Sequence, residues 1–300
     1  MLLERLFENL ALTVDPFATC AVAQGWRLRL PRRDWVVFHF ILEGEGALRL
    51  SPTDARPLRP GTLVVIPPGL AHAVECGALI EREALAADQV TDAPICALVA
   101  GPPEEIELTV ACGRVQVTYG GSLGLFDRLT EPLMLDFSDE PTMQVTFEAL
   151  VREYGQANEG TKAMMTALMN QCLVLVFRRL CNDQECRLPW LSALDDPGLA
   201  PAIDAILAHP DERHTVEILA SRGNMSRSVF ARRFHEALDR TPMEFVRDVR
   251  LRKGARLLHR AELSVEEVAA KVGFASRSHF SRAFHDHFGC SPATFRAGAG

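Results

Sequence analysis

The N-terminal half of the chain alternates short apolar runs with glycine and proline residues. Between residues 21 and 117 these runs are either apolar throughout or alternate apolar with polar residues. They cover residues 26–30, 35–42, 47–50, 61–66 and 95–99. Short strands separated by frequent turn residues are typical of all-β domains. We therefore predict an antiparallel sandwich or small barrel in this region.

From residue 146 the apolar residues recur every three or four positions, which is the period of an α-helix. We predict helices over residues 146–155 and 161–180, and shorter helices over residues 1–12 and 123–131. The helix over 161–180 has an apolar stripe that is wide for a lone surface helix. The stripe consists of Met164, Met165, Leu168, Met169, Cys172, Leu173, Val176, Phe177 and Leu180. Packing against the β-rich region explains part of this stripe, and helix pairing in a homodimer explains the rest.

The last hundred residues contain one helical pattern twice. Residues 215–246 match residues 264–296 with a displacement of 49 positions before an internal turn and 50 after it, because Ala275 lengthens the second turn. After the turn, Ser226, Arg227, Ser228, Phe230, Arg232, Phe234, Pro242 and Phe245 correspond to Ser276, Arg277, Ser278, Phe280, Arg282, Phe284, Pro292 and Phe295. A long helix over residues 242–260 joins the copies. The pattern predicts seven helices in two helix-turn-helix units.

Local signals in the second copy support this prediction. Gly273 ends a short amphipathic helix, and Ser276 lies where the next helix needs an N-cap. Phe280 and Phe284 are four residues apart, so both lie on the face that is buried. The second helix of a helix-turn-helix enters the major groove of DNA. We therefore expect the polar face that follows Ser276 to contact DNA.

The charge distribution divides at about residue 200. The whole chain has a formal net charge of −7. Residues 201–300 contain 16 Lys and Arg against 12 Asp and Glu, whereas residues 1–200 contain 16 against 27. Fourteen of the 16 C-terminal basic residues are arginines, whose planar guanidinium can bind phosphate or guanine through two hydrogen bonds. An acidic sensor joined to a basic DNA-binding domain has this distribution.

The C-terminal pattern resembles the AraC/XylS family of transcription regulators over residues 192–297. The agreement with the family signature runs nearly throughout residues 264–296. Proteins of this family place two recognition helices in adjacent segments of the major groove, on one face of the DNA. The resemblance implies that double-stranded DNA is the partner and that six residues face the bases. These are Ser228, Ala231 and Arg232 in the first unit, and Arg277, Ser278 and Arg282 in the second.

Two of these arginines are the strongest candidates for guanine contacts. An isolated arginine on a helix usually lies on a solvated face. Arg232 and Arg282, however, recur at equivalent places beside the same pair of phenylalanines, and this recurrence favours a role in base recognition. Arg227, Arg233 and Arg247 are expected to contact phosphate, which supplies affinity without sequence information.

A second resemblance lies in the β-rich region. Residues 61–72 read G-x5-P-x-G-x2-H, with a strand, a Pro-Pro-Gly turn and His72 at the start of the next strand. This pattern resembles the second cupin motif. Cys76 stands in the place of the final asparagine of that motif.

Part of the first cupin motif is present upstream. His39 lies in the place of its second histidine and Glu43 in the place of its acid, while Val37 replaces the first histidine. Residues four apart on a strand share a face, so His39, Glu43 and His72 are a candidate set of ligands for zinc or iron. The alternative is that these side chains line a small-molecule pocket or pack in a domain without a metal.

Eight cysteines occur without a CxxC pair, and in a reducing cytoplasm we expect free thiols. The order of cupin, helices and paired helix-turn-helix units resembles one subgroup of regulators. Some members of this subgroup respond to reactive chlorine species through cysteines in the cupin half. The candidates here are Cys20, which precedes the first strand, Cys96 near the partner position, and Cys112. The alternative for each is a buried small apolar residue.

Together these patterns predict an α+β protein with two domains. We expect a cupin-like antiparallel β-barrel sensor with a helical appendage at residues 1–145 and a helical dimerisation and linker segment at 146–191. An all-α domain with two helix-turn-helix units follows at 192–300. The expected function is that of a sequence-specific DNA-binding regulator, an activator, which responds to a small molecule or oxidant and contacts RNA polymerase.

The competing prediction is a metal-dependent cupin enzyme or a metal-sensing module that uses His39, Glu43 and His72. The missing histidine of the first motif and the missing asparagine of the second argue against an enzyme. No apolar run has the length needed to cross a bilayer. Residues 1–8 place acids among their apolar positions, unlike a secretion signal. We therefore expect a cytoplasmic protein without a membrane segment.

Overall fold

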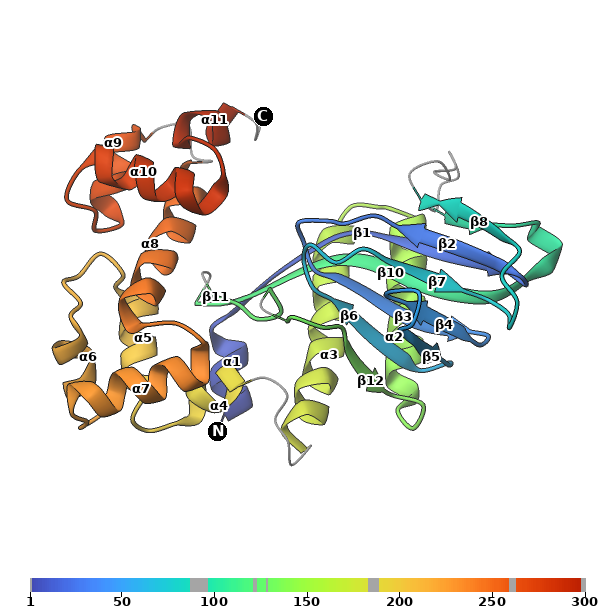
Figure 1. Cartoon of the computed structure of the whole chain (residues 1–300), viewed down its shortest axis with the longest axis horizontal. Coiled ribbons are helices and arrows are strands. Elements are labelled where there is room, and N and C mark those ends of the chain that lie inside the picture. Colours follow the sequence, from blue (N-terminus) through green and yellow to red (C-terminus); the bar gives the residue numbers. More distant parts are fainter. Residues whose placement is uncertain are drawn as a thin grey trace. The chain divides into compact units, whose positions relative to one another are not determined.

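The computed structural model describes residues 2–86, 97–120, 123–127, 129–182, 189–258 and 263–297. The chain divides into two compact units. The sheet unit comprises Leu12–Val117 and Gly124–Asn182. The helical unit comprises Met1–Ala11, Thr118–Leu123 and Asp183–Gly300. The elements of both units are labelled in Figure 1.

The sheet unit contains two β-sheets (Figure 1). The seven-stranded sheet has the order β12-β6-β3-β10-β1-β9, and β11 pairs with β10. Its strands are β1 (Leu10–Ala23), β3 (Val37–Glu43), β6 (Thr62–Ile66), β9 (Ala97–Ala100), β10 (Ile106–Tyr119), β11 (Leu123–Gly124) and β12 (Leu133–Asp136). The five-stranded sheet has the order β5-β4-β7-β2-β8. Its strands are β2 (Trp26–Leu30), β4 (Gly46–Arg49), β5 (Ala55–Leu58), β7 (His72–Glu75) and β8 (Arg82–Leu85).

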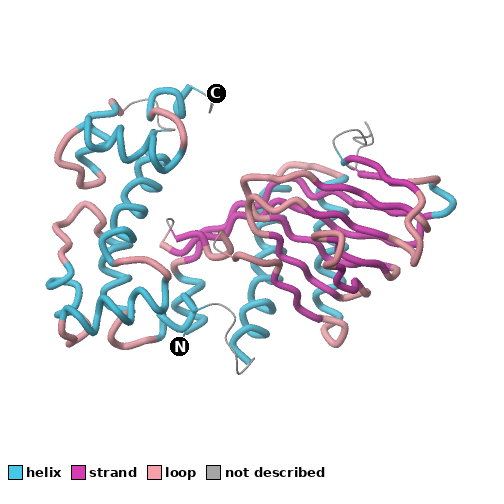
Figure 2. Tube along the Cα trace, in the orientation of Figure 1, coloured by secondary structure: helices cyan, strands magenta, loops and turns pink. Residues whose placement is uncertain are grey.

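Helices α2 (Pro141–Gly155) and α3 (Thr161–Asn182) pack against each other beside the sheets (Figure 2). Phe40 of β3 stacks on Phe147 of α2 with ring centroids 4.4 Å apart. By length and composition α3 could cross a membrane. One apolar face of α3, which includes Met169, Leu173 and Phe177, is nevertheless buried inside the sheet unit, as in a core helix.

The space between the sheets is filled mainly by apolar side chains. Because successive residues of a strand point to opposite faces, Phe40 turns toward α2, while its neighbours His39 and Ile41 turn toward the other sheet. The buried cluster consists of Cys20, Val22, Leu28, Ile41, Leu48, Leu58, Val64, Ile66, Val74, Cys76, Ala84, Ala86, Ala100, Leu108, Val110 and Cys112. His39 and His72 are buried polar residues in the same interior. The two histidines therefore sit in apolar surroundings.

The predicted α+β architecture is confirmed, with one correction to the β-domain. The two sheets are open and do not form a closed barrel: among the described residues, the strands at the ends of each sheet do not pair with one another. Pairing is antiparallel along most ladders but parallel between β1 and β9 and between β2 and β8. Each sheet ends in strands of only four residues, and the side chains between the sheets close the interior in place of a continuous ladder.

Two of the predicted N-terminal elements differ from the structure. The expected helix at 123–131 is wrong, since β11 begins there and the N–H of Leu125 donates to the carbonyl of Val117 at 2.9 Å. The pairing of this segment with β10 therefore outweighs the helix propensity of its sequence. The helix expected at 1–12 is shorter, α1 (Leu2–Glu8), and β1 follows it directly.

The predicted helices in the middle of the chain are present. The helix expected at 146–155 begins earlier, at Pro141, where a proline suits the first helical turn. The helix expected at 161–180 is α3.

The helical unit contains the seven predicted helices of the repeat. They are α5 (Ala200–Ala208), α6 (Val216–Arg222), α7 (Arg227–Leu238), α8 (Pro242–Leu258), α9 (Val265–Lys271), α10 (Arg277–Phe288) and α11 (Pro292–Ala297), preceded by α4 (Pro189–Asp195). Helices α6 and α7 form the first helix-turn-helix, and α9 and α10 form the second. The long helix α8 joins them. The duplicated sequence pattern is therefore a duplicated structure.

The expected caps and core residues occur in both copies. The side chains of Ser226 and Ser276 accept hydrogen bonds from the N–H groups of the third residues of α7 and α10. Gly289 ends α10 with a φ of +72°. The rings of Phe230 and Phe234 lie 5.4 Å apart, and those of their counterparts in α10 lie at the same separation. Each recognition helix is thus fixed along its apolar face and presents the opposite face to solvent.

Candidate DNA-binding surface and sensor site

The exposed face of the second recognition helix carries the three residues predicted to read bases. Arg277, Ser278 and Arg282 are all exposed on α10. Their side chains follow Ser276, so they occupy the N-terminal turns, which in a helix-turn-helix contact base edges. This arrangement can place two guanidinium groups in a major groove.

The first recognition helix has fewer polar groups at the same positions. Ser228 and Arg232 are exposed on α7, and Ala231 is half-buried. Arg232 donates from Nη1 to Glu236 Oε1 at 3.0 Å. Both side chains are more than half exposed, so the pair is weak and can exchange for a DNA contact.

The repeat also exposes two histidines that the sequence reasoning did not place among the base-facing residues. His235 and His285 are equivalent under the displacement of 50 and are both exposed. Each lies three residues after the arginine, and thus on the same helix face as Arg232 or Arg282. The displacement that identified the arginines could have identified this pair.

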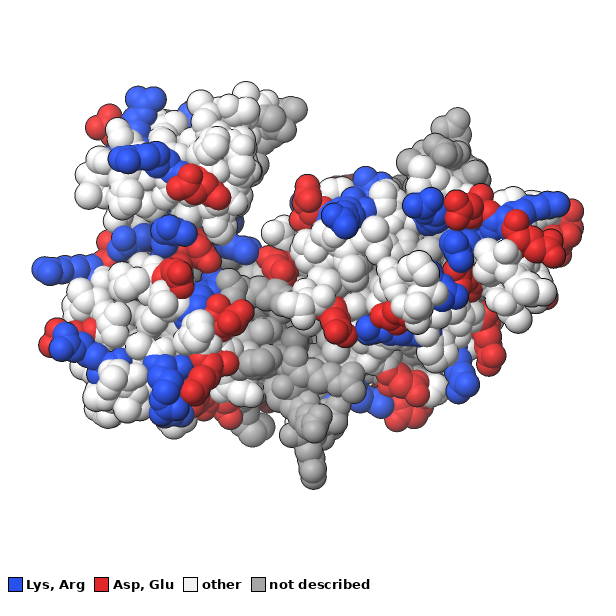
Figure 3. All heavy atoms as spheres, in the orientation of Figure 1, with Lys and Arg blue, Asp and Glu red and all other residues white. Residues whose placement is uncertain are grey.

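The three arginines expected at phosphates have different surroundings. Arg227 and Arg247 are exposed. Arg233 is half-exposed, and its guanidinium donates to the carboxylate of Asp196 and lies 3.5 Å from the sulfur of Met225. Figure 3 shows basic and acidic side chains interspersed on the visible face of the helical unit. The role of Arg233 in phosphate binding stays a prediction, since its charge already has a partner.

A chain of four polar side chains crosses the interior of the sheet unit. His39 on β3 lies opposite Cys112 on β10 in the ladder. Its Nδ1 is 3.0 Å from Cys112 Sγ, and its Nε2 is 2.8 Å from Nε2 of His72 in the other sheet. The Sγ of Cys112 lies 2.6 Å from the Sγ of Cys20 on the adjacent strand β1. The order is therefore Cys20, Cys112, His39, His72.

The one proton of the Cys112 thiol has two neighbouring acceptors, Sγ of Cys20 and Nδ1 of His39. With the Cys112 thiol donating to Nδ1 of His39, Nε2 of His39 donates to Nε2 of His72. Nδ1 of His72 then donates to the carbonyl of Leu70 at 3.4 Å. Both imidazoles are neutral in this arrangement.

Burial keeps the two imidazoles and the Cys112 thiol uncharged. Desolvation lowers the pKa of His39 well below 6.5, and the neighbouring His72 lowers it further. Desolvation also lowers the pKa of His72 to about 4, which outweighs the hydrogen bond to the Leu70 carbonyl. Burial raises the pKa of Cys112 well above 9, and the contact with Cys20 adds to this shift. At neutral pH the resting site holds a thiol, whose proton acceptor is already in contact with it.

The geometry does not fit the metal set expected from the cupin motifs. Glu43 is exposed at the end of β3, away from the histidine pair. The two ring nitrogens of His39 face different partners and do not converge on one point. Among the described residues no group of three or more His, Cys, Asp or Glu side chains can hold a metal ion.

The thiol of Cys76, which stands in the place of the motif's asparagine, is separate from the histidines. The Sγ of Cys76 lies near Gln24 and the carbonyl of Glu45. Burial raises the pKa of Cys76, with a further contribution from Glu107. Cys96 lies outside the described residues. Cys112 was named as a candidate on its sequence context, and its contact with His39 and Cys20 required the fold.

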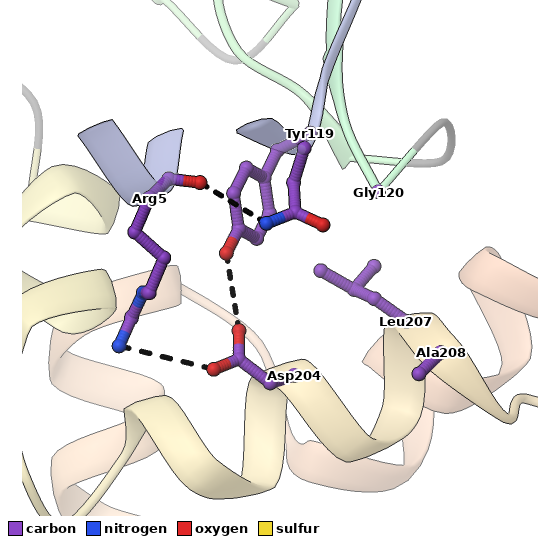
Figure 4. A pocket seen from close by; sticks show the side chains of 7 residues that line it. Arg5, Tyr119, Gly120, Asp204, Leu207 and Ala208 are labelled. Carbon is purple, nitrogen blue, oxygen red and sulfur yellow. Dashed lines mark hydrogen bonds and ion pairs between the residues drawn. The ribbon is translucent and has the colours of Figure 1, made fainter. Parts of the chain in front are cut away.

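A second polar cluster lies within the helical unit, around a cavity of about 480 Å³ (Figure 4). The Tyr119 hydroxyl donates to Oδ1 of Asp204 on α5 at 3.1 Å. Nη1 of Arg5 on α1 lies 3.8 Å from Oδ2 of the same carboxylate. Burial raises the pKa of Tyr119 to about 12, and the charge of Asp204 adds to the shift. The cavity is lined by Arg5, Asn9, Tyr119, Gly120, Asp204, Leu207 and Ala208.

Gly120 brings the end of β10 close to α5. Its φ is +55°, and a Cβ at this position would lie 2.8 Å from Cβ of Leu207. Its N–H donates to the Asn9 carbonyl at 2.9 Å. Only glycine therefore fits here. The sequence reasoning missed this cluster, because the separation of Arg5, Tyr119 and Asp204 along the chain gives no local signal.

Comparison with known proteins agrees with the two units. The sequence profile of the cupin family matches residues 2–182, and that of a helix-turn-helix domain matches residues 219–298. The chain is 28% identical over 261 residues to the HTH-type transcriptional regulator MtrA of Neisseria gonorrhoeae, covering 86% of this chain and 85% of that protein. It is 26% identical over 290 residues to the RCS-specific HTH-type transcriptional activator RclR of Escherichia coli, covering 95% and 92%.

Among solved structures, the DNA-binding domain of AdpA in complex with a target DNA is 36% identical. It covers 34% of this chain and 92% of that domain, with a TM-score of 0.33. The matched relatives are transcription regulators, so the chain is a DNA-binding protein and not an enzyme. The duplicated helix-turn-helix, the cupin domain and these relatives together show that the chain belongs to the AraC/XylS family of transcription regulators that carry an N-terminal cupin domain.

Proposed function

We propose that this regulator senses an oxidant through Cys20 and Cys112 in its cupin domain and activates transcription in response. The contact between the two sulfur atoms, 2.6 Å, carries the proposal. The sulfur atoms are closer than two non-bonded sulfur atoms normally approach, and a disulfide requires an S–S bond of about 2.05 Å. A two-electron oxidant can therefore join the thiols with a small movement of side chains.

The chemistry is balanced with hypochlorous acid as the oxidant. The sulfur of Cys112 attacks the chlorine atom while its proton passes to Nδ1 of His39, which gives a sulfenyl chloride and, after reprotonation of hydroxide, water. The sulfur of Cys20 then displaces chloride and loses its proton. Two thiols and one hypochlorous acid thus give one disulfide, water, chloride and a proton. His39 favours the first step because the thiolate, and not the thiol, is the strong nucleophile.

The strands that hold the thiols offer a route to the DNA-binding unit. Cys20 is on β1 and Cys112 on β10. The first two residues of β1 and the last two of β10 belong to the helical unit. There Tyr119 contacts Asp204 on α5, close to the first helix-turn-helix. A disulfide between the strands changes the strain on this contact, and the DNA-binding unit responds to whichever arrangement is stabilised.

The outer face of α3 supports a homodimer. Met164 is half exposed, and Leu168 and Leu175 are half-buried. With Gln171 they follow the spacing of four, three and four residues that forms the seam of a helix pair. A second copy of α3 is the proposed occupant, and a dimer presents two DNA-binding units to two half-sites.

Two further parts of the proposal follow from the family. We infer a cytoplasmic protein, because its target is DNA. Activation further requires a contact with RNA polymerase. A small organic effector is the second candidate signal, and the test below separates it from an oxidant.

The test uses the full chain and DNA from the region upstream of its own gene. Footprints are compared for reduced protein, for protein treated with one equivalent of hypochlorous acid, and for treated protein reduced again with dithiothreitol. We expect the footprint or its affinity to change on oxidation and to revert on reduction. An unchanged footprint with intact sequence preference would leave a pocket ligand as the signal. Loss of all sequence preference in every sample would contradict the function as a regulator.

A further inference from the structure

Asp248 on α8 turns one carboxylate oxygen toward each helix-turn-helix unit. Oδ2 accepts a hydrogen bond from Nη1 of Arg240 at 2.5 Å. Oδ1 lies 3.6 Å from Nδ1 of His287. Arg240 follows α7 and closes the first unit, whereas His287 lies in the last turn of the recognition helix α10. A single side chain therefore bridges the two halves of the DNA reader.

The bridge is shielded from water. The side chains of Asp248, Arg240 and His287 are 17%, 7% and 22% exposed. The guanidinium of Arg240 also lies over the ring of Phe245, 5.7 Å from its centroid. The ion pair between Arg240 and Asp248 interacts more strongly in such surroundings than a surface pair and tolerates less displacement, because solvent does not replace a lost partner. Desolvation lowers the pKa of His287, so its contact with Asp248 is the weaker of the two.

A second contact joins the two helix-turn-helix units at another point. Arg250 on α8 donates from Nε to the carbonyl of Pro210 and from Nη2 to that of Glu212, at 2.6 and 2.8 Å. The turn of the second unit approaches the same loop, since a Cβ on Gly273 would lie 2.8 Å from Cα of Asp211. Two separate contacts limit rotation about α8 far more than one.

The three bridging residues lie outside the duplicated pattern. Under the displacement of 50, Arg240 corresponds to Cys290, and His287 corresponds to Ala237. Residues that build each unit, such as the phenylalanine pairs, recur in both copies. Residues that join the two copies have no reason to recur in both. Arg240 and His287 do not recur, as expected for residues that join the copies.

We infer that Asp248 is a positioning residue that fixes the distance and angle between recognition helices α7 and α10. The pair then reads its two half-sites at one spacing only. Each added base pair moves a half-site along the DNA axis and rotates it about that axis, because one helical turn takes about 10.5 base pairs. Two recognition helices held at a fixed angle cannot both follow this rotation, whereas two recognition helices with a flexible connection can.

The experiment measures how affinity depends on spacing. Full-length protein is first used to select its preferred duplex from a random library. Duplexes are then made with one or two base pairs added or removed between the two half-sites, and binding is measured by fluorescence anisotropy. For the unchanged protein we expect a loss of about tenfold or more per step, which corresponds to losing at least one base contact. For Asp248→Ala we expect a flatter profile, with the loss per step reduced to about threefold or less.

Two further variants separate positioning from folding. Asp286→Ala removes an exposed acid from α10, so it changes the charge equally and should keep the steep profile. His287→Ala removes only the weaker contact and should flatten the profile even where Asp248→Ala does not fold. An equal loss of affinity at every spacing would overturn the inference, because it would show a merely structural role. All samples in this experiment are kept reduced. Neither result therefore bears on the proposal that Cys20 and Cys112 sense an oxidant.

Discussion

The Sγ atoms of Cys20 and Cys112 lie 2.6 Å apart between the two sheets of the cupin domain. They come from adjacent strands and are 92 residues apart in the chain. Both residues are almost fully buried, so the pair is protected from bulky reagents, and we expect only a small neutral oxidant to reach it. Burial also keeps Cys112 protonated at rest, which sets a threshold against weak oxidants.

Replacing either member of the pair should abolish the response to oxidant. In Cys112→Ser we expect DNA binding of the reduced protein to persist and the change on oxidation to disappear, because no partner remains for Cys20. Peptide mapping by mass spectrometry of the unchanged protein should find a disulfide between the two residues. Cys172→Ala is the matched control, since Cys172 is buried in α3 and burial raises its pKa to about 12. A response that survives in Cys112→Ser would contradict the assignment.

The histidine pair should make the cupin domain sensitive to acid. The pKa of His72 is lowered to about 4 in the folded protein, whereas the unfolded value is about 6.5. Between these values the unfolded state binds a proton that the folded state does not, so stability falls as pH falls. For His72 alone the free energy of unfolding should drop by about 1.4 kcal/mol per pH unit, and by about 3 kcal/mol in all. His39 shifts in the same direction.

Denaturant titrations between pH 7 and pH 4 check this dependence. His72→Gln should be less stable at neutral pH but have a flatter pH profile, because it lacks the titrating group. His209→Gln, which replaces an exposed histidine, should retain the full slope. If His72→Gln keeps that slope as well, the histidine pair is not its source.

The two recognition helices should differ in their dependence on arginine. Arg282→Ala should relax sequence preference at one base position by about 1–3 kcal/mol, because a bidentate contact to guanine is lost. Arg232→Ala should cost less, since that side chain must first leave Glu236. Selection from a random duplex library, repeated with each variant, measures both. An unchanged sequence preference in Arg282→Ala would show that Arg282 does not contact a base.

Tyr119 should couple the cupin strands to the DNA-binding unit. Tyr119→Phe removes one hydrogen bond to Asp204, at a cost of about 1 kcal/mol in stability. The difference in DNA affinity between reduced and oxidised protein should shrink, while thiol oxidation itself proceeds as before. Tyr154→Phe changes the only other tyrosine and should leave the difference intact. An undiminished difference in Tyr119→Phe would place the coupling elsewhere.

The outer face of α3 should hold the dimer. Leu168→Lys introduces a charge into the proposed seam, and burying an unpaired charge is unfavourable. We expect a monomer by light scattering, whereas Thr166→Lys, on another face of the same helix, should remain dimeric. A dimer in both variants would exclude this seam.

The sequence by itself determined the parts of this protein that depend on local periodicity. The duplicated phenylalanines, the serine caps and Gly289 act over a few residues, so the seven helices of the DNA-binding unit could be predicted from their spacing. The base-facing candidates came from the resemblance to the AraC/XylS family, and they stay predictions. The strands of the cupin half were predictable for the same reason, through turns and alternation.

Only the tertiary structure decided which distant residues meet. Glu43 shares a strand with His39, yet it ends in solvent, while Cys112 joins His39 because β10 pairs with β3 in that register. The bridge at Asp248 and the contact of Tyr119 with Asp204 likewise link residues from different elements. Strand order and helix packing are set by the summed burial of the whole core, so no short stretch of sequence contains them. The sequence therefore identified a DNA-binding protein. The fold showed how its thiols and histidines meet and how Asp248 links the two helix-turn-helix units.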